Sequence, residues 1–200
     1  MVSFSSRCNV DVVYIDFSRA FDSIVFNKLL AKLEHYGISG NLLKFISAFI
    51  HNREQCVVLN NCFSSVTSVL SGVPQGSVLG PVLFLIFIND VSTICFGESK
   101  LKLFADDVKL YCASDVDVSN CGDLQQSIDF LSSWANSWQL CINISKCSVL
   151  SIHHNSKDSI PHPYYINGMQ LSNTSSVTDL GIVVDSRLSF NLHISNILAK

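Results

Sequence analysis

Hydrophobic residues follow two different spacings along the chain, which predicts both strands and helices. Residues 9–17, "NVDVVYIDF", are rich in β-branched side chains and are typical of a buried strand. Apolar residues recur at helical spacing in 29–33, 42–50 and 124–138, which predicts amphipathic helices. The largely apolar run at 82–91 favours a buried helix.

Shorter alternating segments predict hairpins. Segments 55–60 and 64–70 flank Asn60 and Asn61, a pair that favours a tight turn. The stretch 101–111, "LKLFADDVKLY", has a strand, turn, strand pattern. Further short strands are expected at 146–152, 164–171 and 176–185, with a turn at "INGM" and a last helix from near Leu188. Strands and helices therefore alternate, which indicates an α+β or α/β class.

Composition indicates one substantial core. The chain has 200 residues, of which 48% are apolar and 14% charged, so one globular domain is the default expectation. The net charge of -3 and the pI near 6.0 lack the basic excess of a free-standing nucleic-acid binder. Any contact with nucleic acid is therefore expected to be local, or shared with sequence outside this chain.

The cysteines and the apolar runs indicate the cellular compartment. No C-x-x-C pair or paired Cys/His spacing occurs among the eight cysteines, which argues against zinc and favours buried, reduced thiols. The start of the chain does not have the pattern of a signal peptide. The longest apolar run, 78–88, is short of the ~20 residues that span a bilayer. We expect an intracellular protein of the cytoplasm or nucleus, neither secreted nor in a membrane.

Two adjacent acids, Asp106 and Asp107, lie at the expected turn of 101–111, and Asp16 ends the first expected strand. Taken singly, such residues are more often turn formers or helix caps. Carboxylates held close together repel each other and raise each other's pKa values, and a divalent cation compensates. If the two strands are neighbours, the three acids converge and are suited to hold two Mg2+ ions about 3.5 to 4 Å apart.

Five segments occur in the order and approximate spacing of the palm motifs of reverse transcriptases from non-LTR (LINE, jockey-like) retrotransposons. They are "YIDFSRAFDSI", "SGVPQGSVLGPVLFLIFINDV", "LKLFADDVKLY", "INISKCSVL" and "VTDLGIVVDSRLSF". The resemblance implies an α+β polymerase palm, an antiparallel sheet that carries the carboxylates with helices on one face. It implies that 1–200 is a reverse transcriptase domain with internal finger insertions, lacking the N-terminal fingers and the thumb.

The implied activity is that of an RNA-directed DNA polymerase, which binds an RNA template, a DNA primer and a dNTP. In this family Asp16, Asp106 and Asp107 correspond to the metal ligands for two Mg2+ ions. We expect Asp106 to be the more direct ligand, because adjacent strand residues point to opposite faces, so that Asp107 either orients the turn or contacts the metal less directly.

The resemblance also implies substrate contacts. The backbone of Phe17 would cradle the triphosphate, and the ring of Phe21 would exclude a ribose 2'-hydroxyl, although plain core packing is the alternative for Phe21. Gln75 and Gly76, in "GVPQGS" with Gly72, would support the nascent base pair. Lys146 would donate a proton to pyrophosphate or contact the triphosphate, and an exposed lysine without a role is the alternative.

Several residues receive other interpretations. Asp22 is better explained as a helix cap than as a third ligand. Leu180 and Gly181 would form the turn of a hairpin that supports the primer end. His153, His154 and His162 are expected in a solvated loop. The rival functions are an inactive retrotransposon-derived fragment or interaction module, and a metal-dependent nuclease, which would leave "PQG" and Phe21 unexplained.

Overall fold

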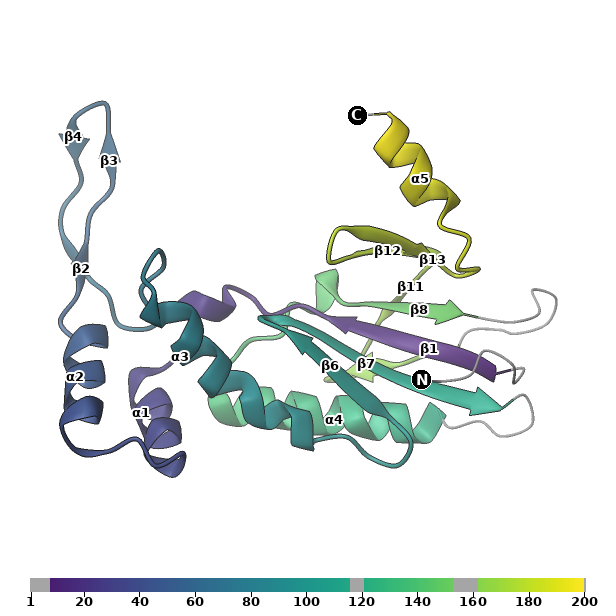
Figure 1. Cartoon of the computed structure of the whole chain (residues 1–200), viewed down its shortest axis with the longest axis horizontal. Coiled ribbons are helices and arrows are strands. Elements are labelled where there is room, and N and C mark those ends of the chain that lie inside the picture. Colours follow the sequence, from purple (N-terminus) through teal and green to yellow (C-terminus); the bar gives the residue numbers. More distant parts are fainter. Residues whose placement is uncertain (1–7, 116–120, 153–161, 200) are drawn as a thin grey trace. The chain divides into compact units, whose positions relative to one another are not determined.

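The computed structural model describes residues 8–115, 121–152 and 162–199. The chain divides into two compact units, each described here by itself. The sheet unit comprises Met1–Asp16, Ser92–Ser133 and Ile142–Lys200, and the helical unit comprises Phe17–Val91 and Trp134–Cys141. Figure 1 shows the elements of both units.

The sheet unit is built on a five-stranded sheet with the strand order β11-β8-β1-β7-β6. Its strands are β1 (Cys8–Ile15), β6 (Lys100–Phe104), β7 (Asp107–Asp115), β8 (Ser148–Ile152) and β11 (Ser172–Thr174). The pairs β1–β7, β1–β8 and β6–β7 are antiparallel, and only the β11–β8 pair of this sheet is parallel. The central strand is therefore the first one in the chain.

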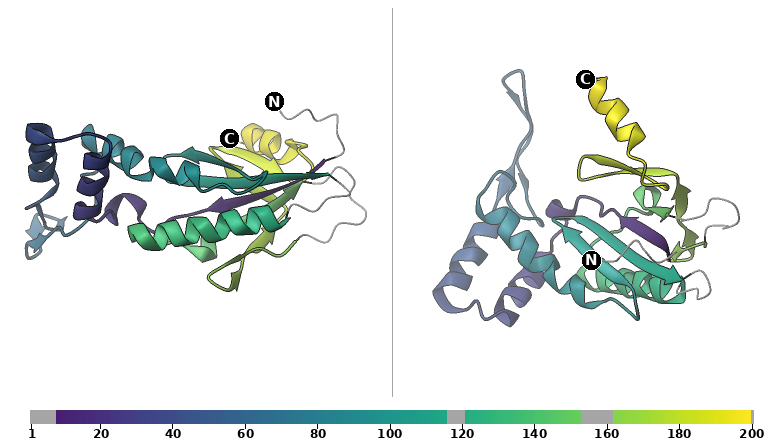
Figure 2. Two further views of the ribbon diagram at one scale, coloured as in Figure 1. Left: turned by 90° about the horizontal axis from the view of Figure 1, so that it is seen from below. Right: turned by 45° about the vertical axis from the view of Figure 1, so that its right-hand side comes forward.

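The two faces of this sheet differ in character. Val13, Ile15, Val108 and Leu110 are buried and share one face, because Val13 pairs with Leu110 and Ile15 with Val108. Helix α4 (Cys121–Trp138) runs along one side of the sheet (Figure 2), and its Leu124, Ile128 and Leu131 are fully buried. The opposite face carries Tyr14 and Lys109, which are only half-buried. One face of the sheet is thus apolar and buried, and the other is more polar and partly exposed.

Smaller elements complete the sheet unit. They are the 3-10 helix η3 (Ile144–Lys146), the hairpins β9 (Tyr165–Ile166)–β10 (Met169–Gln170) and β12 (Ser176–Asp179)–β13 (Ile182–Asp185), and helix α5 (Asn191–Leu198). The side chain of Gln125 accepts a hydrogen bond from the Tyr165 N–H and donates one to its C=O, both at 2.9 Å. These two hydrogen bonds attach β9 to α4, because the Gln125 amide pairs with the Tyr165 backbone in the way that an adjacent strand would.

The helical unit consists of short helices and one long hairpin. Its elements are η1 (Ala20–Asp22), α1 (Phe26–His35), α2 (Gly40–Ile50), β2 (Glu54–Gln55), β3 (Val58–Leu59), β4 (Cys62–Phe63), β5 (Thr67–Ser68) and α3 (Leu79–Ile88), with η2 (Asn89–Thr93) following α3. Strands β2 and β5 pair, as do β3 and β4. Asn60 and Asn61 form the turn with φ of 49° and 62°, the left-handed values that a two-residue hairpin needs.

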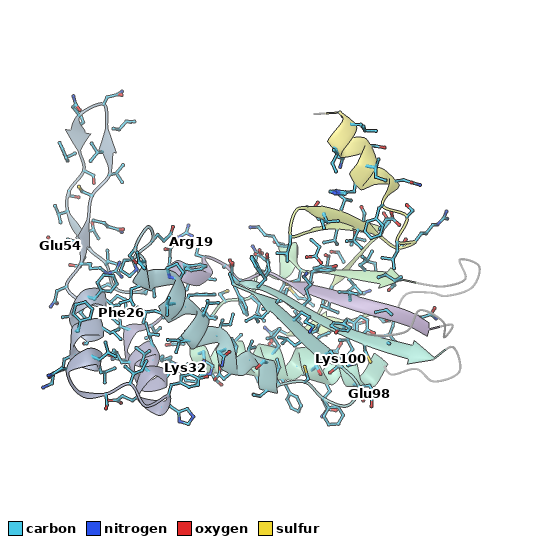
Figure 3. The ribbon with its side chains drawn as sticks, viewed as in Figure 1. Arg19, Phe26, Lys32, Glu54, Glu98 and Lys100 are labelled. Carbon is cyan, nitrogen blue, oxygen red and sulfur yellow. The ribbon has the colours of Figure 1, made fainter. Side chains whose placement is uncertain are left out.

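A buried cation joins the helices of this unit. Lys32 of α1, labelled in Figure 3, is 3% exposed and forms an ion pair of 2.6 Å with Asp90. Its ammonium group also donates to the Phe87 carbonyl and lies 3.8 Å from the ring centroid of Trp138. Burial lowers the pKa of Lys32, and the hydrogen bond and charge of Asp90 oppose that shift. Lys32 is therefore held by an ion pair, a backbone carbonyl and aromatic rings of the same unit.

The expected class and most expected elements are confirmed. The structure is α+β, its main sheet is predominantly antiparallel, and the predicted helices and hairpins form. The parallel strand β11 was not predicted, because "SNT" has neither apolar alternation nor β-branched enrichment. The described cysteine side chains are free thiols, but Cys56, Cys62 and Cys141 are exposed, so the expectation of buried thiols was wrong for these.

Two further expectations concern the histidine-rich loop and membrane-spanning segments. His153 and His154 lie outside the described residues. The centroid of the His162 ring lies 5.0 Å from that of the Tyr164 ring. Among the residues that the structure describes, no helix is long and apolar enough to cross a membrane.

Candidate active site

Strand register brings Asp16 and Asp107 together. Ile15 pairs with Val108 in the antiparallel β1–β7 ladder, so Asp16 and Asp107 are the next residues beyond that pair and lie on the same face. The segment that leads into β8 holds Asp16 through its backbone. The Asp16 C=O accepts from the Asn143 N–H at 2.8 Å, and its N–H donates to Cys147 Sγ at 3.5 Å. Backbone contacts thus leave the Asp16 carboxylate free to face Asp107.

Asp106 occupies the turn rather than a strand. Phe104 pairs with Asp107, which leaves Ala105 and Asp106 as the two turn residues. Ala105 has a φ of 52°, the left-handed value that the first position of a type II' turn requires. Both acids were expected at the tip, but Asp107 is the first residue of β7. The register makes Asp107 the neighbour of Asp16. The expectation that Asp106 is the more direct ligand stays a prediction.

A pocket of about 160 Å3 lies on this face of the sheet unit. Asp16, Asp107 and Lys146 line it together with Tyr14, Lys109, Ser148 and the tip of the β12–β13 hairpin. Lys146, the last residue of η3, places its Nζ 3.9 Å from Asp16 Oδ2. The lysine side chain is 68% exposed, so this ion pair adds little stability and its ammonium group is accessible to a ligand.

Negative charge in the pocket is only partly compensated. The surrounding protein displaces water from Asp107 and raises its pKa, and the neighbouring Asp106 charge raises it further. Lys109 opposes the shift, while Asp179 and Asp16 add to it. Within the described ranges, no three His, Cys, Asp or Glu side chains converge closely enough to hold a metal ion. The excess of carboxylate oxygens nevertheless fits a hard divalent cation, which would neutralise it.

Replacing Asp107 with asparagine is expected to stabilise the fold slightly at neutral pH. A carboxyl whose pKa is raised above its ordinary 3.8 by folding stabilises the folded protein at acidic pH, where the carboxyl is protonated. This stabilisation is lost as the pH rises through the raised pKa. Because the group is largely solvated and screened, we expect a gain of only a few tenths of a kcal/mol. Urea denaturation at pH 7 and pH 4 would measure the gain and its shrinkage on acidification, with Asp129→Asn on α4 as the control. Equal or lower stability of Asp107→Asn at pH 7 would contradict the prediction.

The helical unit holds a second group of expected site residues. The ring of Phe21 stacks on that of Phe84, with centroids 4.1 Å apart and planes at 16°. Gln75 Nε2 donates to Asp22 Oδ1 at 2.7 Å. Gly72 has a φ of +83° and passes so close to Asp22 that a Cβ would lie 2.6 Å from its Cα. The glycine therefore allows the approach of one backbone to another, which places Gln75 beside η1.

Phe17 and Gly76 have different surroundings. The Phe17 ring is buried, 6.4 Å from that of Trp134, so only its backbone is suited to contact a ligand. Gly76 has a φ of +78° and open space at its Cβ position. Asp22 was expected to cap a helix, but it ends η1 and accepts from Gln75, whereas the N-cap of α1 is Val25. The capping expectation was wrong, because the chain makes a 3-10 turn before α1 begins.

A polar pocket of about 710 Å3 adjoins these residues. Arg19, labelled in Figure 3, and Arg53 line it with Asp22 and Gln75. Arg53 donates to the carbonyls of Ile50 and Gly72, which leaves part of its guanidinium for other partners. Burial lowers the pKa of Arg53. Neither arginine was singled out from the sequence, although Arg19 lies within "YIDFSRAFDSI" and is the only basic residue there.

Each unit thus gathers its own set of expected residues. Asp16, Asp107 and Lys146 share the pocket of the sheet unit, and Asp106 is the adjacent turn residue. Asp22 and Gln75 share the pocket of the helical unit, with Phe21 in η1.

The chain belongs to the reverse transcriptase (RNA-dependent DNA polymerase) family, whose model matches residues 6–184. The resemblance to non-LTR element enzymes is confirmed. The chain is 33% identical over 190 residues to the RNA-directed DNA polymerase from mobile element jockey of Drosophila funebris, covering 92% of this chain and 20% of that protein. It is 27% identical over 203 residues to the probable RNA-directed DNA polymerase from transposon X-element of Drosophila melanogaster, covering 100% and 22%.

Solved structures share the fold at low sequence identity. Apo telomerase from Candida tropicalis, truncated from the C-terminal domain, matches with a TM-score of 0.61 and 12% identity, covering 92% of this chain and 35% of that one. Telomerase from Candida albicans in complex with a telomeric RNA fragment gives 0.57 and 15%, covering 90% and 31%. The chain spans about a fifth of the length of the two curated relatives named above.

Proposed function

We propose that this chain is the catalytic palm region of an RNA-directed DNA polymerase that extends a DNA primer on an RNA template. The observation that carries the proposal is the register of β1 and β7, which sets Asp16 opposite Asp107 on the open face of a supported sheet. Membership of the reverse transcriptase family and similarity to mobile-element polymerases support it. We infer that the reaction takes place inside the cell, in the nucleus or cytoplasm.

The metal cofactor that we propose is a pair of Mg2+ ions held by Asp16, Asp107 and the turn residue Asp106. Bound Mg2+ would lower the pKa of the primer 3'-hydroxyl and neutralise the triphosphate. The carboxylates themselves supply hard oxygen donors from two adjacent strands, and the apolar layer beneath them limits their movement. Burial raises the pKa of Asp107 and the charges of Asp106 and Asp16 raise it further, so a cation that neutralises these carboxylates would bind favourably.

Lys146 and the residues of the helical unit are proposed to contact the nucleotide. The exposed ammonium group of Lys146 is suited to donate a proton to the leaving pyrophosphate or to pair with the triphosphate. Arg19 and the backbone of Phe17 would contact phosphates, and Gln75 and Gly76 would lie under the nascent base pair. Phe21 would exclude the 2'-hydroxyl of a ribonucleotide. We propose that residues 1–200 form one reverse transcriptase domain.

The direct test is Mg2+-dependent extension of a DNA primer on an RNA template. The chain should be assayed alone and extended by flanking sequence, each with dNTPs and with EDTA as the metal-free control. We expect extension in at least the longer protein, abolished by EDTA and restored by Mg2+. If neither protein extends a primer under conditions in which both are folded by circular dichroism, the proposed function is wrong.

Replacing Phe21 with valine is expected to relax discrimination against ribonucleotides by about 10- to 100-fold, the effect of removing a steric element that acts on one hydroxyl group. The ring is half-buried and stacks on Phe84, so the substitution also removes a packing contact. The measurement is the ratio of kcat/KM for dNTP to that for rNTP in the active protein.

The matched control for Phe21→Val is Phe84→Leu, which disrupts the same stack from the fully buried side. This control should lower stability without changing the dNTP to rNTP ratio. An equal change in that ratio for both variants would mean that Phe21 acts through core packing, and the steric role would be rejected.

A further inference from the structure

An ion pair connects the β12–β13 hairpin to the central strands of the sheet. Lys109 of β7 donates to the carboxylate of Asp179, the last residue of β12. The two side chains are 19% and 20% exposed. The Lys109 ammonium group also lies 5.9 Å from the centroid of the Tyr14 ring on β1. Asp179 is therefore held by a side chain of β7 that also contacts an aromatic ring of β1.

The hairpin is not an extension of the main sheet. Strands β12 and β13 pair only with each other, and form a separate two-stranded sheet. A two-stranded hairpin is marginally stable in water without further packing. Figure 1 shows β12 and β13 directly after β11, which joins the sheet through β8. Side-chain contacts such as that of Asp179 must therefore contribute to its position.

The environment of these three side chains favours a specific, persistent contact. The Tyr14 ring is half-buried and lines the same pocket as Lys109 and Asp179. Lys109 and Asp179 are four-fifths removed from solvent, so their attraction is screened less than that of a surface pair.

The position of the hairpin matters because its tip is one wall of the acidic pocket. Val177, Thr178, Asp179 and Leu180 line that pocket opposite Asp16 and Asp107. Leu180 and Gly181 form the turn with positive φ values of 47° and 85°. A change in the hairpin would thus alter the space beside the carboxylates without touching their own strands.

We propose that Tyr14, Lys109 and Asp179 form a latch that holds the β12–β13 hairpin as the wall of the carboxylate pocket. Lys109 and Asp179 are then positioning residues for the polymerase reaction, and this second statement rests on the proposed function. Lys109 also lines the pocket with Asp107 and Asp179, so its positive charge offsets part of the negative charge of these two acids.

Hydrogen exchange of the 200-residue chain tests the latch without any assay of activity. Asp179→Asn and Lys109→Met should each accelerate amide exchange in residues 176–185 by about tenfold or more, with exchange in β1 unchanged. Lys100→Met, on the exposed edge strand β6, is the matched control and should leave the hairpin unchanged. Unchanged exchange in the hairpin of both latch variants would overturn the proposal.

A double variant separates the latch from general loss of stability. Each single substitution leaves a partner unpaired, so Lys109→Met with Asp179→Leu, which pairs two apolar side chains, should restore much of the lost protection. Lys109→Arg, which keeps the positive charge, should keep the hairpin amides as protected as in the unmodified protein. If the double variant exchanges as fast as the two single effects combined, the residues act independently and the latch is rejected.

Kinetics test the positioning role in the protein that extends primers. Asp179→Asn and Lys109→Met should each lower kcat/KM for the primer–template by about 10- to 100-fold, as small misplacements near a reacting centre do. Lys109→Arg, which keeps the ion pair, should retain most of the activity, and Lys100→Met should not change it. Normal kinetics with a mobile hairpin would refute the positioning role alone, whereas absence of extension by the unmodified protein would refute the proposed function and leave the exchange result valid.

Discussion

Asp16→Asn is expected to reduce Mg2+-dependent primer extension by more than about a thousandfold while leaving the fold intact. The substitution removes a charged oxygen ligand, and metal stabilisation of transition-state charge is worth several kcal/mol, which is about three orders of magnitude in rate. The backbone of Asp16 makes the contacts to Asn143 and Cys147, so the asparagine side chain fits without moving β1. The measurement is single-turnover extension across a Mg2+ titration, with circular dichroism to verify folding.

Asp129→Asn on the exposed surface of α4 is the matched control for Asp16→Asn, because it removes the same charge from the sheet unit outside the pocket. It should extend primers at the unmodified rate. Parallel Asp106→Asn and Asp107→Asn variants rank the two adjacent acids, and the larger loss identifies the more direct ligand. A folded Asp16→Asn protein that retains a tenth or more of the activity would exclude Asp16 as a metal ligand.

Gly72→Ala is expected to lower the free energy of unfolding of the helical unit by about 2 to 5 kcal/mol. The left-handed backbone costs a residue with a Cβ about 1 to 2 kcal/mol, and overpacking adds about 1 to 3 kcal/mol. The clash would fall on backbone atoms of Asp22 at 2.6 to 2.9 Å, which cannot rotate away as a flexible side chain would. Relief would require η1 and "GVPQGS" to separate, which would also displace Gln75 from Asp22.

Gly37→Ala separates the two costs of this substitution. Gly37 has a φ of +85° and nothing within 4 Å of its Cβ position, so only the backbone cost applies. Hydrogen exchange of α1 and α3 under mild urea would compare the two variants within the same unit. Equal destabilisation by Gly72→Ala and Gly37→Ala would show that the close approach of Asp22 has no energetic consequence.

Local chemistry explains why most elements were predictable. The β-branched run in 9–17 favours a strand whatever surrounds it, and the apolar spacing in 124–138 leaves one face of a helix to be buried. The asparagine pair at 60–61 tolerates the left-handed turn. By contrast, β11 is defined only by its hydrogen bonds to β8, and a polar tripeptide carries no sign of such a partner.

The candidate site shows the same division. Asp16, Asp106, Asp107 and Lys146 were identified because the order of several motifs is specific even where each motif is weak. Arg19 and Arg53 were missed because a basic residue near a turn is ordinary in sequence, and only the packing of the loops places both in one pocket. Asp22 was misassigned because a capping residue and the end of a 3-10 turn look alike until the next helix is located.

The sequence by itself determined the family, most of the elements and the acids, because these depend on residue identity, spacing and order along the chain. The tertiary structure alone decided which acid faces which, since a shift of register by one residue moves every side chain of a strand to the opposite face. Register placed Asp107 opposite Asp16 and left Asp106 in the turn. Packing of the separate β12–β13 hairpin brought Asp179 to Lys109 across seventy residues of chain. Such pairings arise from the combined packing of many residues, and no single segment specifies them.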